Sequence, residues 1–232
     1  MRLLLLASEV RSGSTYIAET LAYSFAQSYG IECWGLAKEQ FASIALNRNP
    51  LLLNEIFNGM YINQAGFRTS KLMVKDIVGL INIFDNDRSL YDEFFSDSCA
   101  WLIVRRRNKL RQAVSLAFAE QSGVWHHYDV DELTNDSRLT LAPSDVRPYY
   151  NSVIASDDFL DLFSEQLVRK YTVYYEDFRE NPSSVAMEII NKLGIPVDPM
   201  SFIFSSPKLV PTSQLEKVEL ERDFRRYFLR NL

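Results

Sequence analysis

The chain has 232 residues, of which 47% are hydrophobic and 24% are charged, and its formal net charge is −5 at pH 7. This composition fits one medium-sized globular α/β domain over residues 1–232 and argues against an intrinsically disordered chain. The negative charge argues against a generally basic nucleic-acid-binding surface. Any anion site must therefore be built locally from a few basic residues.

The cysteines and histidines are few and show no ligand pattern. Cys33 and Cys99 give neither a disulfide framework nor a zinc or redox spacing, and they suit a reducing compartment. His126 and His127 are adjacent, so they lack the spacing of metal ligands. We therefore expect a cytoplasmic protein whose chemistry requires no metal.

Short apolar runs alternate with longer helical patterns along the chain, which predicts an α/β fold with a central parallel sheet flanked by helices. The first run, Leu3–Ala7, is apolar on both faces and is expected to be a buried strand. It is too short for a signal peptide or a membrane span. Further strands are expected at 71–74, 100–104 and 172–175, and helices at 14–29, 110–122, 143–167, 182–193 and 215–232.

The stretch between residues 121 and 142 has no clear periodicity and contains Trp125. A loop of this length inside a compact domain is often functional, for example as a lid over a site.

The segment after the first strand has the composition of an anion-binding loop. It reads Arg11-Ser12-Gly13-Ser14-Thr15 and leads into the first helix. A helix N-terminus offers backbone N–H groups and partial positive charge, and glycine lets the backbone approach an oxyanion. The loop lacks the lysine and the length of a Walker A loop, so it suits one phosphate or a phosphosulfate. A small-residue turn with a serine helix cap is the alternative.

A second basic segment follows the strand at 100–104. Five basic residues and no acid occur between positions 105 and 111. Arg107, Arg111 and Ser115 share one face if the helix begins at Arg107, and such a face can hold a dianionic phosphate. A solvated basic helix start is the alternative, although arginines at a helix N-terminus are unfavourable unless an anion compensates them.

These segments resemble the 3'-phosphoadenosine 5'-phosphosulfate (PAPS)-dependent sulfotransferase superfamily, and more narrowly its bacterial trehalose 2-sulfotransferase-like family. The resemblance rests on RSGST at 11–15, SKLM at 70–73, VRRRNKLRQAVSLAFAEQSGVWH at 104–126 and VYYEDF at 173–178. It implies a P-loop-like sulfotransferase fold and transfer of a sulfuryl group from PAPS to a hydroxyl of a carbohydrate or glycolipid. It also implies a small-molecule or glycolipid acceptor as partner, and it allows a homodimer because the family includes dimers. The negative net charge indicates no nucleic acid as partner.

The resemblance also assigns roles to single residues. Glu39 is implied as the general base and Tyr175 as an adenine-side contact. In the displacement at sulfur that this implies, Arg11 would be a catalytic charge stabiliser, and Lys71 is a further candidate for assisting the leaving group. The loop is implied to bind the 5'-phosphosulfate through Arg11, Ser12, Gly13, Ser14, Thr15 and Tyr16. The second basic segment is implied to bind the 3'-phosphate through Arg107 and Ser115. Alternatives stay open for two of these residues, a core tyrosine for Tyr175 and a first-turn helix acid for Glu39.

The sequence departs from the family pattern at several positions. Val10 replaces a usual proline, and Glu9 places a carboxylate near the expected sulfonate pocket, where it is an alternative base. Val74 replaces a usual tryptophan, and the segment containing Lys208 and Thr212 matches poorly. These departures keep a catalytically silent nucleotide-binding or scaffold protein open as an alternative. A small-molecule kinase is a further alternative, although the Walker lysine is missing.

Overall fold

The computed structural model describes residues 2–29, 67–84, 88–123, 125, 141–195, 198–205 and 215–230. The chain divides into two compact units, Met1–Arg105 with Phe159–Pro207, and Arg106–Asp158 with Lys208–Leu232. One domain over residues 1–232 stays a prediction.

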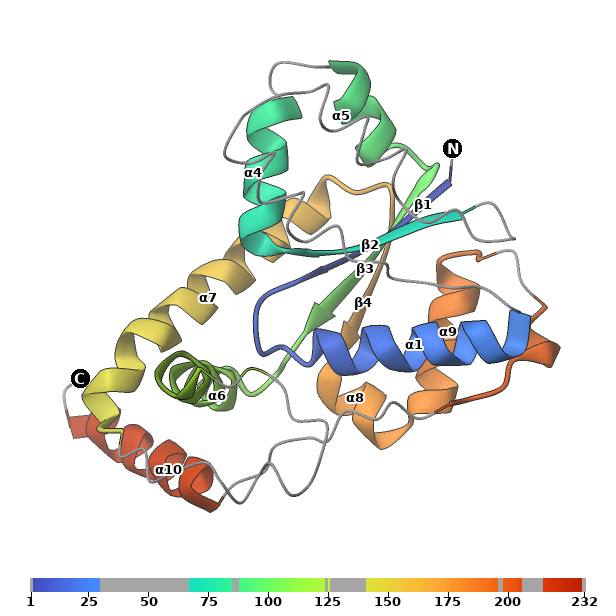
Figure 1. The fold of residues 1–232 in the computed structure, drawn as a ribbon. Coiled ribbons are helices and arrows are strands. Elements are labelled where there is room, and N and C mark those ends of the chain that lie inside the picture. Colours follow the sequence, from blue (N-terminus) through green and yellow to red (C-terminus); the bar gives the residue numbers. More distant parts are fainter. Residues whose placement is uncertain are drawn as a thin grey trace. The chain divides into compact units, whose positions relative to one another are not determined.

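A four-stranded sheet with the order β2-β1-β3-β4 forms the centre of the first unit (Figure 1). All three strand pairings are parallel, which confirms the predicted α/β fold with a central parallel sheet. The strands are β1 (Arg2–Ser8), β2 (Phe67–Met73), β3 (Cys99–Arg105) and β4 (Arg169–Tyr174). A parallel sheet needs apolar residues on both faces, and this explains the unbroken apolar runs of β1 and β3.

Helices cover one face of the sheet through α4 (Val74–Phe84), α5 (Arg88–Phe95) and the end of α7 (Pro143–Glu165). Leu5 from β1 and Trp101 from β3 are buried on this face with Phe94 and Phe163. The indole Nε1 of Trp101 donates a hydrogen bond to the carbonyl of Phe94 over 3.0 Å, so the largest core side chain is also satisfied as a donor.

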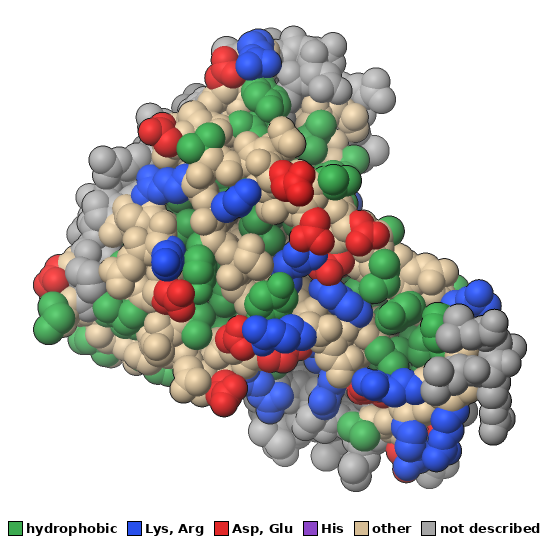
Figure 2. All heavy atoms as spheres, turned by 180° about the vertical axis from the view of Figure 1, so that it is seen from behind, with side chains coloured by type: hydrophobic (Ala, Val, Ile, Leu, Met, Phe, Trp, Pro, Cys, Tyr) green, Lys and Arg blue, Asp and Glu red, His purple; other side chains and the backbone are tan. Residues whose placement is uncertain are grey.

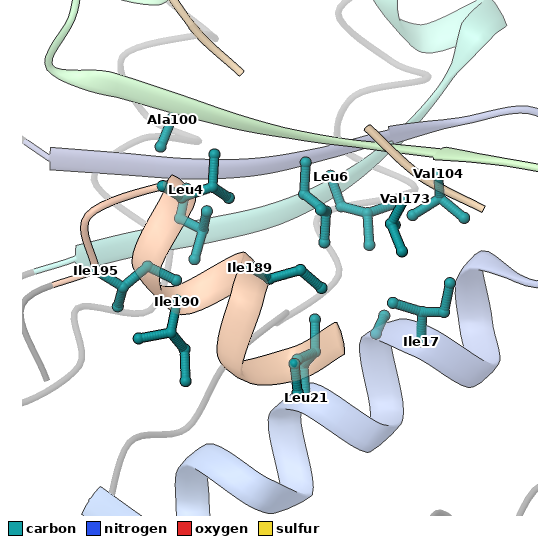
Figure 3. Close-up of a cluster of buried hydrophobic side chains, with 14 of the residues drawn as sticks. Leu4, Leu6, Ile17, Leu21, Ala100, Val104, Val173, Ile189, Ile190 and Ile195 are labelled. Carbon is teal, nitrogen blue, oxygen red and sulfur yellow. The ribbon is translucent and has the colours of Figure 1, made fainter. Parts of the chain in front are cut away.

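The opposite face is covered by α1 (Ser14–Tyr29), α8 (Tyr175–Glu180) and α9 (Pro182–Lys192). Leu4 and Leu6 of β1 extend from the sheet toward Leu21 of α1 and Ile189 of α9 (Figure 3). Successive residues of β1 thus alternate between the two cores. This cluster packs α1 against the sheet, and the loop that leads into α1 begins at the carboxyl end of β1.

A short 3-10 helix, η2 (Pro199–Ser201), precedes an extended segment that runs along α1. The backbone N–H groups of Ile203 and Ser205 donate to the hydroxyls of Ser28 and Ser24 over 2.6 and 2.9 Å. These two serines, one turn apart, give the segment hydrogen-bond partners that a sheet would otherwise supply.

The second unit contains α6 (Lys109–Ser122), the part of α7 up to Asp158, and α10 (Leu215–Arg230). Asn108 caps the start of α6, and Gly123 ends it with a φ of 73°, as predicted from its position. Phe224 of α10 is buried, and its ring centroid lies 5.6 Å from that of Tyr150 of α7.

Several boundaries differ from the predicted ones. Val74 begins α4 rather than ending β2, because the carboxylate of Asp76 accepts a hydrogen bond from the N–H of Met73 over 2.9 Å and stabilises a helix start there. Tyr175 is the first residue of α8 rather than the end of β4. The helices α4, α5 and α8 were not predicted.

Charged side chains of both signs lie among one another over most of the face shown in Figure 2. This distribution agrees with the small negative net charge of the sequence. Within the described ranges, no helix combines the length and the apolar composition needed to cross a membrane.

Candidate functional site

The loop between β1 and α1 has an unusual backbone. Arg11 has a φ of 57° and Gly13 a φ of 90°. The N–H of Ser12 bonds to the carbonyl of Glu9 over 3.3 Å, and the first helical hydrogen bond runs from Ile17 to Gly13 over 3.1 Å. A left-handed conformation costs a residue with a side chain about 1–2 kcal/mol. Such strain at Arg11 is typical of functional loops.

Helix geometry leaves the first amides of α1 without acceptors inside the helix. These are the N–H groups of Ser14, Thr15 and Tyr16, which precede the bond donated by Ile17. Together with the helix dipole they form an anion-binding end, as the sequence predicts. The loop lies at the carboxyl end of β1, the usual place for ligands in parallel α/β sheets.

Ser12 provides an independent sign of a ligand. Its side chain is 1% exposed, and its Oγ has no hydrogen-bond partner among the residues that the structure describes. A buried hydroxyl left unsatisfied costs about 1–3 kcal/mol. A bound oxyanion would accept the hydrogen bond, so the donor set of the loop fits a phosphate or a sulfonate.

Tyr175 lies directly against the loop. A Cβ on Gly13 would come within 2.7 Å of Cγ and 2.8 Å of Cε2 of the Tyr175 ring. The ring also meets that of Tyr16 edge-on, with centroids 6.2 Å apart. Burial and the nearby Tyr175 raise the pKa of Tyr16, so this phenol stays neutral. Tyr175 therefore supports the backbone of the loop, and its predicted contact with adenine stays a prediction.

Lys71 brings a cation to the loop from the neighbouring strand. It pairs in register with Leu6 of β1 and is only 9% exposed. Its Nζ donates a hydrogen bond to Oγ1 of Thr15 over 2.9 Å. The ammonium group thus lies at the helix end that lacks a Walker lysine. In the sequence, Lys71 is indicated as a charged residue within a predicted strand.

Two positive charges of the basic segment are paired with carboxylates that lie outside the segment. In the first unit, the guanidinium of Arg105 forms two hydrogen bonds with the carboxylate of Asp161, one of them over 3.1 Å. In the second unit, Nζ of Lys109 lies 2.5 Å from Oδ1 of Asp157. These two cations therefore have carboxylate partners on α7, outside the segment in which the sequence shows no acid.

The condition for a shared face of Arg107, Arg111 and Ser115, a helix that begins at Arg107, is not met. α6 begins at Lys109, because the Oδ1 of Asn108 accepts a hydrogen bond from the N–H of Arg111 over 2.9 Å and caps the helix there. Arg107 is exposed and precedes the helix, whereas Arg111 and Ser115 share a helical face one turn apart. Their predicted binding of a 3'-phosphate stays a prediction.

Other predicted residues lie outside the described part of the chain. These include Glu39, His126, His127 and the C-terminal segment with Lys208 and Thr212. Trp125 is described and is 37% exposed. Among the described residues, no group of three or more His, Cys, Asp or Glu side chains is arranged to hold a metal ion, and a metal-independent reaction stays a prediction.

Comparison with known families identifies the family of most of the chain. A family model described as Stf0 sulphotransferase matches residues 58–226, most of the chain. The match contains Lys71, the basic segment and Tyr175, and it begins after the loop at 11–16 and after Glu39. No curated protein matches the chain.

Proposed function

The chain belongs to the Stf0 sulphotransferase family, and from this premise we propose that it transfers a sulfuryl group from PAPS to a hydroxyl of a carbohydrate or glycolipid. Family membership supports a transferase, and sulfotransferases generally use this donor. The single observation that carries the proposal is the loop after β1. It contains a buried serine hydroxyl without a described partner, it leads into three helix-end amides, and the Lys71 ammonium bonds to Thr15 beside it.

The residues of the loop have separate tasks in this proposal. Arg11 and the amides of Ser14 and Thr15 bind the sulfonate and phosphate oxygens, because backbone N–H groups and a guanidinium both donate to anions. Ser12 donates its buried hydroxyl. Gly13 keeps the backbone close to both the ligand and Tyr175. Tyr16 completes the loop as the first-turn amide that follows Thr15.

The second basic segment is assigned to the 3'-phosphate of the donor. Arg107 and Ser115 are the residues implied by the family resemblance, and Tyr175 is assigned to the adenine side. The ion pairs of Arg105 and Lys109 support this division. Those two cations already have carboxylate partners, so the assignment of the phosphate falls on other residues of the segment.

The reaction is an in-line displacement at sulfur. The acceptor oxygen forms a bond to sulfur as the bond from sulfur to the bridging phosphate oxygen breaks, and adenosine 3',5'-bisphosphate leaves. Glu39 takes the proton of the acceptor hydroxyl, with Glu9 as the alternative base. Arg11, Lys71 and the loop amides stabilise the charge that develops on the bridging and sulfuryl oxygens. Positioning and charge stabilisation therefore supply most of the rate, and we propose that no metal takes part.

The proposal is tested by following radiolabel from PAPS carrying sulfur-35 to trehalose, other disaccharides and a glycolipid. We expect labelled sugar and an equal amount of adenosine 3',5'-bisphosphate. Loss of a general base lowers the rate by about 10²–10⁴-fold. Glu39→Gln and Glu9→Gln therefore identify the base by which of them shows this loss.

Two results would contradict the proposal. Tight binding of the bisphosphate without transfer to any acceptor would favour a catalytically silent nucleotide-binding protein. Transfer of label from ATP carrying γ-phosphorus-32 would favour a small-molecule kinase, to which Lys71 would then supply the cation that a Walker lysine usually provides. A cytoplasmic location and a homodimer stay predictions of the family resemblance and the cysteine content.

A further inference from the structure

The side chain of Asn108 links the C-terminal helix α10 to the start of α6, because its amide bonds to a group of each helix. Its Oδ1 accepts the N–H of Arg111 over 2.9 Å, and its Nδ2 donates to Oε1 of Glu221 in α10 over 3.1 Å. All of these residues belong to the second unit. Both ends of the amide are thus used, one for capping a helix and one for holding another helix.

Glu221 is a charged and well-held partner. Its side chain is 14% exposed, and Oε1 also accepts a hydrogen bond from Nη2 of Arg225 over 2.8 Å. Burial raises the pKa of the Glu221 carboxyl, but the hydrogen bonds from Asn108 and Arg225 and the charges of Arg225 and Arg111 outweigh burial and hold the pKa below its ordinary value. The group is therefore a carboxylate at neutral pH, which strengthens its hydrogen bond with Asn108.

The position of α10 does not depend on this contact alone. Leu220 and Phe224 are buried on either side of Glu221, and Phe224 and Phe228 lie against the ring of Tyr150 in α7. Apolar packing thus anchors the helix, and Glu221 is held at a fixed place on it. A fixed carboxylate can in turn hold Asn108.

Arg107 is the residue that this arrangement affects. Its carbonyl accepts the N–H of Lys109 over 3.0 Å, and the carbonyl of Asn108 accepts the N–H of Gln112 over 3.0 Å. The backbone on the C-terminal side of Arg107 is therefore set by the cap of α6. An arginine gains affinity for a phosphate only if its backbone is held where the guanidinium can reach, since ordering it on binding costs free energy.

We propose that Asn108 and Glu221 are positioning residues for Arg107, so that the affinity for a 3'-phosphate depends on the hydrogen bond from Asn108 to α10. The inference rests on the proposed function, in which Arg107 binds that phosphate. Neither residue touches the nucleotide. Their effect is specific to ligands that carry a 3'-phosphate.

The test compares two ligands by isothermal titration calorimetry with the full-length protein. Adenosine 3',5'-bisphosphate carries the 3'-phosphate, and adenosine 5'-monophosphate lacks it. Glu221→Ala removes the acceptor, whereas Asn108→Ser keeps an oxygen that can cap α6 but loses the amide donor. Loss of one hydrogen bond to a charged group corresponds to about a tenfold fall in affinity. We expect this fall for the bisphosphate in both variants and less than about a twofold change for the monophosphate.

Two further variants separate positioning from folding. Glu221→Gln keeps an oxygen acceptor and is expected to retain most of the affinity for the bisphosphate. Glu219→Ala removes an exposed acid from the same helix and is expected to change neither affinity. The double variant Asn108→Ser with Glu221→Ala is expected to lose no more than either single variant, because both remove the same hydrogen bond.

The outcomes distinguish failure of the positioning role from failure of the proposed function. If the unmodified protein prefers the bisphosphate and both Glu221→Ala and Asn108→Ser keep that preference, the positioning role is wrong and the proposed function stands. Equal affinity of the unmodified protein for the two ligands would overturn the 3'-phosphate assignment, and the positioning role with it. An equal loss for both ligands in Asn108→Ser would also overturn the role, since it would show a general effect on folding.

Discussion

Two glycines with positive φ angles, Gly13 and Gly123, are under different constraints. A Cβ on Gly123 would have no heavy atom within 4 Å, whereas a Cβ on Gly13 would overlap the ring of Tyr175. Gly123 is therefore needed only for its backbone conformation at the end of α6. Gly13 is needed for its conformation and for the space that its hydrogen leaves to the aromatic ring.

We predict that Gly13→Ala and Gly123→Ala differ in their cost. Gly123→Ala should lower the free energy of unfolding by about 1 kcal/mol, the usual cost of placing a side chain at positive φ. Gly13→Ala should cost about 1–3 kcal/mol more, because overpacking against Tyr175 is added. It should also weaken binding of adenosine 3',5'-bisphosphate. Urea unfolding followed by circular dichroism measures the free energy of unfolding of both variants, and equal losses of stability would contradict the contact with Tyr175.

Lys71 supplies the sharpest prediction about the reacting groups. A hydrogen bond to a charged group contributes about 1.5–3 kcal/mol, so Lys71→Met should lower kcat/KM for sulfuryl transfer by about 10–150-fold. The stability of the fold should change little or rise, because a methionine needs no desolvation of a charge.

The matched control is Lys75→Met, which removes an exposed cation from the first turn of α4. Steady-state kinetics and urea unfolding of both variants provide the measurement. A Lys71→Met protein with the kcat/KM of the unmodified protein would show that Lys71 only supports Thr15.

The residues of the loop could be predicted from the sequence, but the ion pairs that compensate the basic segment could not. Arg11, Ser12 and Gly13 follow a buried strand and precede a helix, and this local order is visible in the sequence. The partners of Arg105 and Lys109 are not local. They lie 56 and 48 residues further along the chain, on α7, so a count of charges within the segment overstates its positive field.

At the level of helices and strands, apolar runs predicted the strands well, whereas helix starts depend on capping residues that were missed. The strands β1 and β3 were predicted within two residues of their bounds because their apolar runs are long. A helix start at Arg107 was the condition for a shared face with Arg111 and Ser115, but Asn108 caps α6, which begins at Lys109. The start of α4 depends on Asp76, three residues after Met73, a signal that an apolar pattern does not contain.

The contact between β4 and α9 gives a prediction about pH. Burial, followed by a hydrogen bond to Glu188 of α9 and the negative charges of Glu188 and Asp177, raises the pKa of Tyr171 from its ordinary value of 10.0 to about 12. Because the pKa in the folded state lies above that in the unfolded state, Tyr171 contributes stability that is fully present below pH 10 and is lost as pH rises to about 12.

Urea midpoints measured at about pH 9 and about pH 11 test this prediction. The unmodified protein should lose stability between the two values, and Tyr171→Phe should lose less over the same interval, since it lacks the titrating group. The phenolate absorbance near 295 nm should give a correspondingly high titration midpoint for one tyrosine. An equal loss in both proteins would contradict the contact with Glu188.

At the scale of the whole molecule, the chain passes from the first unit to the second at Arg105–Arg106 and returns at Asp158–Phe159. No composition change marks these points, because both fall beside or within regular elements, β3 and α7. The division into two units was therefore not predicted. The parallel sheet was predicted, because it follows from the alternation of apolar runs and helical patterns. The family was also predicted, because its motifs are spread along the chain.

The proposed PAPS site is tested by the binding of adenosine 3',5'-bisphosphate, the product that PAPS leaves, to the full-length protein. Thermal and urea unfolding are recorded alone, with adenosine 3',5'-bisphosphate, and with ATP at the same concentration. A ligand at about 100 times its dissociation constant adds about 2.7 kcal/mol to the free energy of unfolding. We predict stabilisation of this order with the bisphosphate and little with ATP. No stabilisation by the bisphosphate at about 1 mM, or an equal effect of ATP, would contradict a PAPS-binding site in this protein.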